Sequence, residues 1–273
     1  MLNFLQNVQV LLFKNEQKNI MSKINANTYT IDNNLVNFIP FGVDINKFTT
    51  LINEKQTNEF LLKLKQTYAQ KKAIFIGVER LDYQKSLHLK FRAYDLFLEN
   101  LVETKGLKRE NCLFIQIGVP VKLYANEYVD YAQSVMDQCE QINRKYSTNA
   151  VEFINKNVDD LNWLVALYRL SDVCVISAQS DGMNLVAQEY ILCQEDKTRP
   201  GVLIMSEFTG TASLFKSKFT LNPFDCDLMA QRYHDAIEMS DEERKQMHDD
   251  VVNVVKMFSL SKSVRGICES IAY

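Results

Sequence analysis

The sequence is poor in the residues that interrupt regular structure, with 8 glycines and 4 prolines among 273 residues. Flexible linkers are usually rich in such residues, so this scarcity argues against long linkers. Neither an internal repeat nor a low-complexity tract is present. The apolar fraction of 47% and the charged fraction of 24% are typical of a globular chain. We therefore expect one large domain or two modest ones.

Charge and cysteine patterns argue against several functional classes. A formal net charge of -3 gives no broad attraction to nucleic acid or to an acidic membrane, so neither is expected as a partner. The six cysteines form no C-x-x-C pair, which argues against a zinc site. Cys112 and Cys174 lie in apolar runs, and buried free thiols suit a reducing, cytoplasmic location. The three histidines lie far apart in the sequence, and we expect none of them to be catalytic.

The first forty residues differ from the rest of the chain. Residues 1–13 are apolar but lack a basic segment and a small-residue cleavage site, and they are too short to span a bilayer. We expect a buried helix there. Residues 27–31 and 35–38 flank an Asp-Asn-Asn turn, which predicts a hairpin. We interpret residues 1–38 as the helix and hairpin that end a preceding domain, and residues 39–273 as one domain.

Short apolar runs alternate with segments of helical periodicity from about residue 50 onward. Continuous apolar runs are typical of strands that are covered on both faces. The alternation predicts an α/β fold with a doubly wound, mainly parallel sheet, which binds ligands outside the carboxyl ends of its strands. The predicted strands lie at 73–78, 112–117, 151–154, 172–177 and 202–205. Residues 61–71 are the predicted end of a helix, and further helices are predicted at 87–101, 126–146, 159–170 and 184–193.

Two cations follow the first predicted strand. Arg80 and Lys85 should both stand at the carboxyl edge of the sheet. Such a pair suits a diphosphate, because arginine offers a planar fork of donors and lysine a mobile point charge. The alternative is that Arg80 pairs with Asp82 or Glu79, and the spacing leaves both interpretations open.

A second candidate segment, residues 181–189, follows the strand that ends near Ser177. Gly182 permits a tight turn into the next helix. The N–H groups of Leu185 and Val186 then fall in the first helical turn, where the helix dipole favours a phosphate.

Two carboxylates of this segment could bind a sugar. Asp181 could accept hydrogen bonds from sugar hydroxyls, and Glu189, about one turn into the helix, could accept them from a vicinal diol such as ribose. The alternative is that Asp181 caps the helix and that Glu189 is a solvated residue.

Together these segments resemble the trehalose-6-phosphate synthases, which are retaining glycosyltransferases with two Rossmann-like domains, the GT-B fold. The match covers most of residues 39–260. The matching segments lie, in order, at residues 40–44, 78–85, 115–120, 170–174, 181–190, 201–210 and 222–225.

The resemblance implies a donor site for UDP-glucose. Arg80 and Lys85 would be the catalytic pair that binds the diphosphate. The other implied contacts come from Asp181, Gly182, Met183 and Asn184 to the glucose hydroxyls and phosphate, from the backbone of Leu185 and Val186, and from Glu189 to the ribose.

The resemblance also implies a reaction. The family transfers glucose from UDP-glucose to glucose 6-phosphate with retention at the anomeric carbon. The leaving phosphate would help to deprotonate the acceptor while the basic pair stabilises the developing charge, so neither a metal nor a cofactor is expected.

This chain departs from the family pattern at four places. Lys122 stands where the family has an arginine that contacts the acceptor's phosphate, which keeps the charge but loses the bidentate geometry. Ser86 replaces a usual glycine and Ser180 a usual arginine. The tryptophan that the family has near its C-terminus is replaced near Val264.

Residues 1–38 match only the end of the family's acceptor-binding domain, and the helix after about residue 255 would cross back onto that domain. Three hypotheses therefore stay open. The chain is part of an enzyme of trehalose synthesis, or it is a non-catalytic UDP-glucose-binding or regulatory module or a truncated inactive copy, or it is a different GT-B transferase. A full-length homologue or an oligomer is the expected protein partner.

Overall fold

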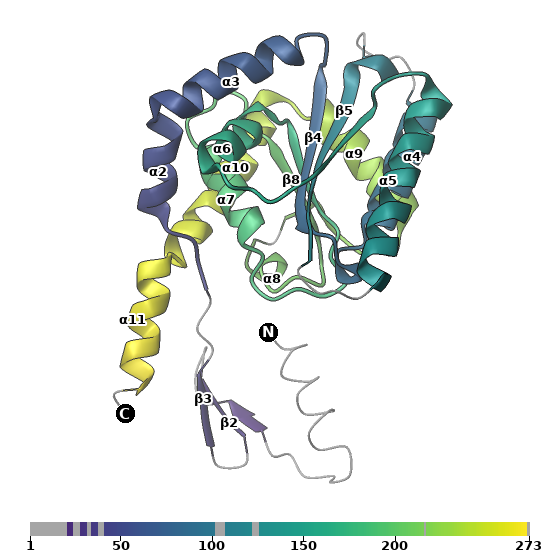
Figure 1. The fold of residues 1–273 in the computed structure, drawn as a ribbon. Coiled ribbons are helices and arrows are strands. Elements are labelled where there is room, and N and C mark those ends of the chain that lie inside the picture. The colour runs from purple at the N-terminus through teal and green to yellow at the C-terminus, as the bar shows by residue number, and fades with distance from the viewer. Residues whose placement is uncertain are drawn as a thin grey trace.

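The computed structural model describes residues 21–23, 28–31, 34–37, 41–101, 107–121, 126–215 and 217–271. A six-stranded sheet forms its centre, with the strand order β6-β5-β4-β7-β8-β9 and only parallel pairings (Figure 1). The strands are β4 (Ala73–Arg80), β5 (Cys112–Val119), β6 (Val151–Asn155), β7 (Val173–Ile176), β8 (Val202–Ser206) and β9 (Thr220–Leu221).

Helices cover both faces of this sheet, as Figure 1 shows. One face carries α4 (Leu87–Asn100), α5 (Asn126–Tyr146) and α9 (Cys226–Glu238). The other face carries α2 (Ile45–Asn53), α3 (Lys55–Thr67), α6 (Leu161–Leu170), α7 (Leu185–Cys193) and α10 (Asp241–Met257). Short helices lie at η1 (Tyr83–Lys85), η2 (Arg109–Asn111) and α8 (Ala212–Phe215). None of the helices in the described ranges is both long and apolar enough to cross a bilayer.

The central strands are apolar throughout because both of their faces are buried. In β4, Phe75 packs into the layer under α4, α5 and α9, whereas Ile74 and Ile76 pack into the opposite layer. All three are at most 5% exposed. Full burial of such a side chain contributes about 1.5–3 kcal/mol, so these two layers hold the domain together. The predicted doubly wound α/β fold and its five predicted strands are confirmed.

Some boundaries differ from the prediction. The helix whose end is expected over 61–71 is α3, which ends at Thr67. The backbone of Tyr68 leaves the helical region there, and a turn leads into β4. The strand expected over 172–177 is shorter at both ends.

The order of the strands reverses between β4 and β7. The chain runs outward from β4 to β5 and β6, and then returns to place β7 on the other side of β4. The two strands pair in parallel, with Phe75 opposite Val173 and Ile76 opposite Cys174. Doubly wound sheets bind their ligands at such a reversal, outside the carboxyl ends of the strands.

A separate small sheet contains β1 (Met21–Lys23), β2 (Thr28–Ile31) and β3 (Asn34–Asn37). The last two form an antiparallel pair in which Ile31 lies opposite Asn34. The predicted hairpin is therefore confirmed. The helix expected over residues 1–13 lies outside the described residues.

The chain enters and leaves the large domain at one place. Gly42 donates its N–H to Ser263 Oγ at 3.2 Å, and Leu260 donates its N–H to the Val43 carbonyl at 2.9 Å. A Cβ atom on Gly42 would lie 1.3 Å from the Phe258 carbonyl oxygen, so only glycine fits. Figure 1 shows α11 (Leu260–Ile271) running from this junction away from the sheet.

A buried ion pair lies beneath the carboxyl end of β4. Lys90 of α4 is 0% exposed and donates to Glu79, whose other carboxylate oxygen accepts from Gln116 Nε2 at 2.6 Å. This cluster crosses the interface between α4 and the sheet. Glu79 therefore points into the protein, whereas its neighbour Arg80 points out.

We predict that Lys90→Met strongly destabilises the domain. The substitution leaves the Glu79 carboxylate buried without its counter-ion, which typically costs about 3–5 kcal/mol. Urea denaturation of both proteins measures the difference. The double variant Glu79→Leu/Lys90→Met should regain most of the loss, because no charge then remains buried. An equal loss in the single and double variants would contradict this explanation.

Candidate functional site

Arg80 ends β4 and is exposed. Its Nη2 lies 3.3 Å from Asp82 Oδ2, and 62% of its side chain is accessible to solvent. The pairing with Asp82 is thus the one present, whereas Glu79 is engaged by Lys90. Exposed ion pairs contribute only about 0–1 kcal/mol, so a ligand phosphate can compete with Asp82 for the guanidinium.

Lys85 reaches from the loop after β4 to the loop after β7. Its Nζ donates to Asp181 Oδ2 at 2.7 Å, and the two side chains are only 12% and 21% exposed. The two residues are 96 positions apart in the sequence. The structure therefore brings the two predicted segments into direct contact at the reversal of strand order.

Two hydrogen bonds to backbone carbonyls hold the Lys85 loop against the end of β7. Gln179 donates its N–H to the Gln84 carbonyl at 2.7 Å, and Ser177 Oγ donates to the Lys85 carbonyl at 2.8 Å. Neither contact could be predicted from the sequence, because backbone carbonyls leave no signal in it. They fix the position from which the lysine side chain extends.

Asp181 is held by its own loop. Its Oδ1 accepts from the Gly182 N–H at 2.9 Å, and its Oδ2 accepts from Asn184 Nδ2 at 2.9 Å. Burial alone would raise the pKa of Asp181, but the hydrogen bonds from Lys85, Asn184 and Gly182 outweigh burial and lower it. The carboxylate is therefore ionised at neutral pH.

Asn184 caps the N-terminus of α7. Its side chain accepts from the Ala187 N–H at 2.9 Å, so the interpretation of Asp181 as the cap of α7 is wrong. Asn184 in turn donates its N–H to Thr211 Oγ1 at 2.9 Å. This bond joins the start of α7 to the loop after β8.

The first turn of α7 offers donors. Leu185 and Val186 are its first two residues, and their N–H groups have no acceptor within the helix. The described parts of the chain supply no other acceptor for them. A Cβ atom built on the nearby Gly182 would meet nothing within 4 Å, and Met183 beside it is partly exposed. This surface is open to a ligand and favours an anion.

Glu189 is partly buried on α7. It accepts a hydrogen bond from Tyr168 Oη at 3.1 Å, so it is not simply a solvated residue. Burial raises the pKa of Glu189 to about 7, against the lowering effects of the Tyr168 hydrogen bond and the Lys47 charge. Tyr168 lies on α6, and no motif in the sequence predicted this contact.

The positions that depart from the family pattern differ in their surroundings. Ser86 is buried and has φ 52° and ψ 41°, a left-handed conformation that glycine adopts more easily. Its hydroxyl has no hydrogen-bond partner. Ser180 is exposed, and Val264 is 48% exposed. Lys122, the candidate contact for the acceptor's phosphate, lies outside the described residues.

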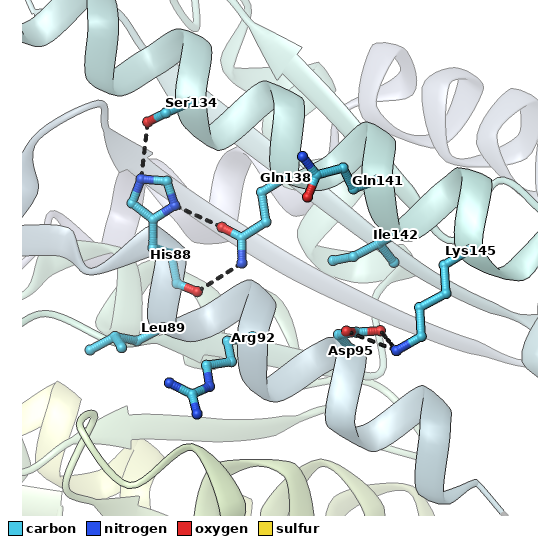
Figure 2. Close-up of a pocket in the computed structure, with 9 residues that line it drawn as sticks. All are labelled: His88, Leu89, Arg92, Asp95, Ser134, Gln138, Gln141, Ile142 and Lys145. Carbon is cyan, nitrogen blue, oxygen red and sulfur yellow. Dashed lines mark hydrogen bonds and ion pairs between the residues drawn. The ribbon is translucent and has the colours of Figure 1, made fainter.

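Another hollow, of about 660 Å³, lies between α4 and α5. Figure 2 shows that much of its polar lining is already paired: His88 bonds Gln138 and Ser134, and Lys145 pairs with Asp95. None of its lining residues is among the predicted site residues. The described part of the chain contains no cluster of three or more side chains suited to hold a metal ion.

The fold defines a Rossmann-like domain, and Arg80, Lys85 and the start of α7 lie at its topological switch point. The sequence pattern of glycosyltransferase family 20 matches residues 1–270. The chain is 33% identical over 227 residues to an alpha,alpha-trehalose-phosphate synthase [UDP-forming] of Aspergillus fumigatus, covering 82% of this chain and 46% of that protein. It is also 33% identical over 238 residues to the synthase of Encephalitozoon cuniculi, covering 85% and 50%. The chain belongs to glycosyltransferase family 20.

Solved structures share the fold. A structure from E. coli bound with UDP-2-fluoro glucose has a TM-score of 0.78 and 27% identity, covering 91% of this chain and 55% of that chain. A UDP-forming synthase from Burkholderia xenovorans in complex with glucose-6-phosphate has a TM-score of 0.80 and 26% identity, covering 90% and 54%. The N-terminal domain of a Candida albicans trehalose-6-phosphate phosphatase has a TM-score of 0.79 and 25% identity, covering 92% and 54%. The chain thus spans about half the length of the relatives it matches.

We predict that Ser86→Gly stabilises the protein. Relief of the left-handed strain and removal of an unpaired buried hydroxyl outweigh the entropy of glycine in the unfolded chain, a net gain of about 1 kcal/mol. Thermal denaturation of both proteins measures this gain in stability. Ser86→Ala removes the hydroxyl but keeps the strain, so it should gain less. Equal effects of the two substitutions would show that the backbone conformation contributes nothing.

Proposed function

We propose that residues 39–273 are the donor-binding half of an enzyme that transfers glucose from UDP-glucose to glucose 6-phosphate, giving trehalose 6-phosphate. Residues 1–38 would then be the end of the acceptor-side domain. The observation that carries the proposal is the contact between Lys85 and Asp181 at the reversal of strand order. It places a cation, which can bind a diphosphate, beside a carboxylate, which can bind sugar hydroxyls.

The diphosphate would be bound by side chains at and just after the end of β4 and by backbone N–H groups at the start of α7. Arg80 can exchange its exposed pair with Asp82 for a phosphate. Lys85 keeps two ammonium protons free while it donates to Asp181. The N–H groups of Leu185 and Val186 complete the set at the start of α7. All four groups would stabilise the charge that develops on the leaving phosphate.

The sugars would be bound by the carboxylates. Asp181 has unused lone pairs for glucose hydroxyls, and Asn184 keeps it in place. Gly182 and Met183 border the open surface where the glucose and its phosphate would lie. Glu189, once ionised, would accept from the two ribose hydroxyls.

The acceptor would be deprotonated with the help of the leaving phosphate, on the face where the donor bond breaks. No side chain of this chain is then needed as a nucleophile. Lys122 is proposed to bind the phosphate of glucose 6-phosphate as a point charge. We place the protein in the cytoplasm, which the buried free thiols of five cysteines support.

A second function has specific support. A similar fold occurs in a domain of a protein named trehalose-6-phosphate phosphatase, so the fold is not confined to proteins named as synthases. The alternative is a non-catalytic UDP-glucose-binding module that acts beside a full-length homologue or in an oligomer. Release of UDP from UDP-glucose and glucose 6-phosphate would support the transferase. Because the chain alone is proposed to hold only the donor side, donor binding without turnover would support the module only when an acceptor-side domain is supplied.

We expect Arg80→Ala and Lys85→Ala each to weaken UDP binding by about 1.5–3 kcal/mol, through loss of charged hydrogen bonds. Titration calorimetry with UDP measures the change. Arg144→Ala is the matched control for Arg80, because it removes an exposed arginine whose carboxylate partner is Glu140, at the end of α5. Its affinity should equal that of the unaltered chain. Lack of UDP binding by the unaltered chain would refute the donor site.

We expect UDP affinity to rise with pH through about 7, because the ionised Glu189 is the stronger acceptor and can accept from both ribose hydroxyls. Calorimetry across this range, repeated with Glu189→Gln, isolates the effect, since the phosphates of UDP titrate identically in both experiments. The substitution should flatten the pH dependence. The same pH profile in both proteins would exclude the ribose contact.

Stability measured without UDP provides a control for Glu189. Its pKa is raised from 4.5 to about 7 on folding, so ionisation destabilises the fold increasingly as the pH rises through this interval. Glu189→Gln should therefore be more stable than the unaltered chain above pH 7, by about 2 kcal/mol, with the gain lost towards low pH.

A further inference from the structure

Tyr83 lies in the loop between Arg80 and Lys85 and is fixed although it is 47% exposed. Its hydroxyl donates to the Glu127 carbonyl at 2.7 Å, in the first turn of α5. Its ring centroid lies 4.4 Å from that of Tyr131 and 5.8 Å from that of Tyr128. One side chain therefore joins the loop after β4 to the start of the helix after β5.

The same helix also holds the far end of the loop. Tyr131 is 6% exposed, and its hydroxyl accepts from the Leu87 N–H at 3.2 Å, where α4 begins. The loop is thus attached to α5 on both sides of Lys85, by Tyr83 before it and by Leu87 after it. On the opposite side it is attached to the end of β7 by the bonds from Gln179 and Ser177.

The loop is therefore held from two sides. Lys85 extends from a loop that is held between α5 and β7, and it meets Asp181 on the β7 side. Loss of the attachment to α5 would leave the loop bonded mainly on the β7 side. The two cations would then sample more positions, and a diphosphate would have to order them on binding.

We propose that Tyr83 is a positioning residue, which holds Arg80 and Lys85 in place for the donor's diphosphate by fixing their loop to the first turn of α5. The inference rests on the proposed function. Tyr83 need not touch the ligand. It acts by lowering the entropy that binding must remove from the loop.

A purely structural role predicts a different result. Loss of the bond to Glu127 and of the two ring contacts would then lower the stability of the fold and weaken the binding of all ligands alike. A positioning role affects ligands that carry phosphates and spares those that do not. Uridine lacks the phosphates that Arg80 and Lys85 would bind, so the ratio of UDP affinity to uridine affinity separates the two roles.

The test measures UDP and uridine binding to the full chain by NMR titration. Tyr83→Ala should weaken UDP binding by about tenfold and leave uridine binding within about twofold. Tyr83→Phe keeps the ring contacts but loses the bond to Glu127, so its loss of UDP affinity should be smaller. This conservative variant also keeps the test decisive should the alanine variant fail to fold.

Tyr146 provides the matched control. It is also a tyrosine whose hydroxyl bridges two elements, donating to Asp95 Oδ1 at 2.8 Å, but it lies at the opposite end of α5. Tyr146→Ala should bind UDP and uridine like the unaltered chain.

Two outcomes would overturn the inference alone: UDP affinity unchanged in both Tyr83 variants, or equal losses for UDP and uridine. If the unaltered chain bound UDP and Arg80→Ala weakened that binding, the proposed donor site would stand without Tyr83. If the unaltered chain failed to bind UDP, the donor site and the inference would both fall.

Discussion

The contact between Lys85 and Asp181 depends on the order of the strands more than on either residue. The two side chains meet because β7 pairs with β4 and not with β6, which precedes it in the chain. A right-handed return of the chain across the sheet is what brings the two loops to one edge. The start of α7 and its free N–H groups occupy the same edge for the same reason. The order of the strands therefore brings the residues of the candidate site together, and the individual motifs supply their side chains.

Beneath this edge, buried polar groups fix which side chains at the end of β4 face inward and which face outward. Glu79 and Arg80 are adjacent, and the strand sends one inward and the other outward. The inward carboxylate meets Lys90 and Gln116 from two different elements, so a shift of the strand by one residue would bury the wrong charge. This buried cluster therefore fixes the register that exposes Arg80.

The sequence predicted the layers of the fold well because its strands are continuous apolar runs with both faces buried. It also indicated which loops carry polar groups at the carboxyl edge. It could not show that Asn184 and not Asp181 caps α7, since either residue type serves at that position. Nor could it show the partner of Glu189, because Tyr168 is on a different helix and its hydroxyl forms part of no local pattern. Contacts made by backbone carbonyls, such as those that hold the Lys85 loop, have no sequence signature at all.

The junction around Gly42 has a mechanical consequence. The chain enters through residues 41–44 and leaves through α11, and the two segments are bonded to each other where they meet. A pulling force applied to both ends of the domain would be borne first by the bonds between Gly42 and Ser263 and between Val43 and Leu260. The parallel strands would stay unloaded until these bonds broke. The entry segment is also bonded to α7, because Gln188 accepts from the Val43 N–H and donates to the Phe41 carbonyl, so part of such a force would reach the helix that begins at the candidate site.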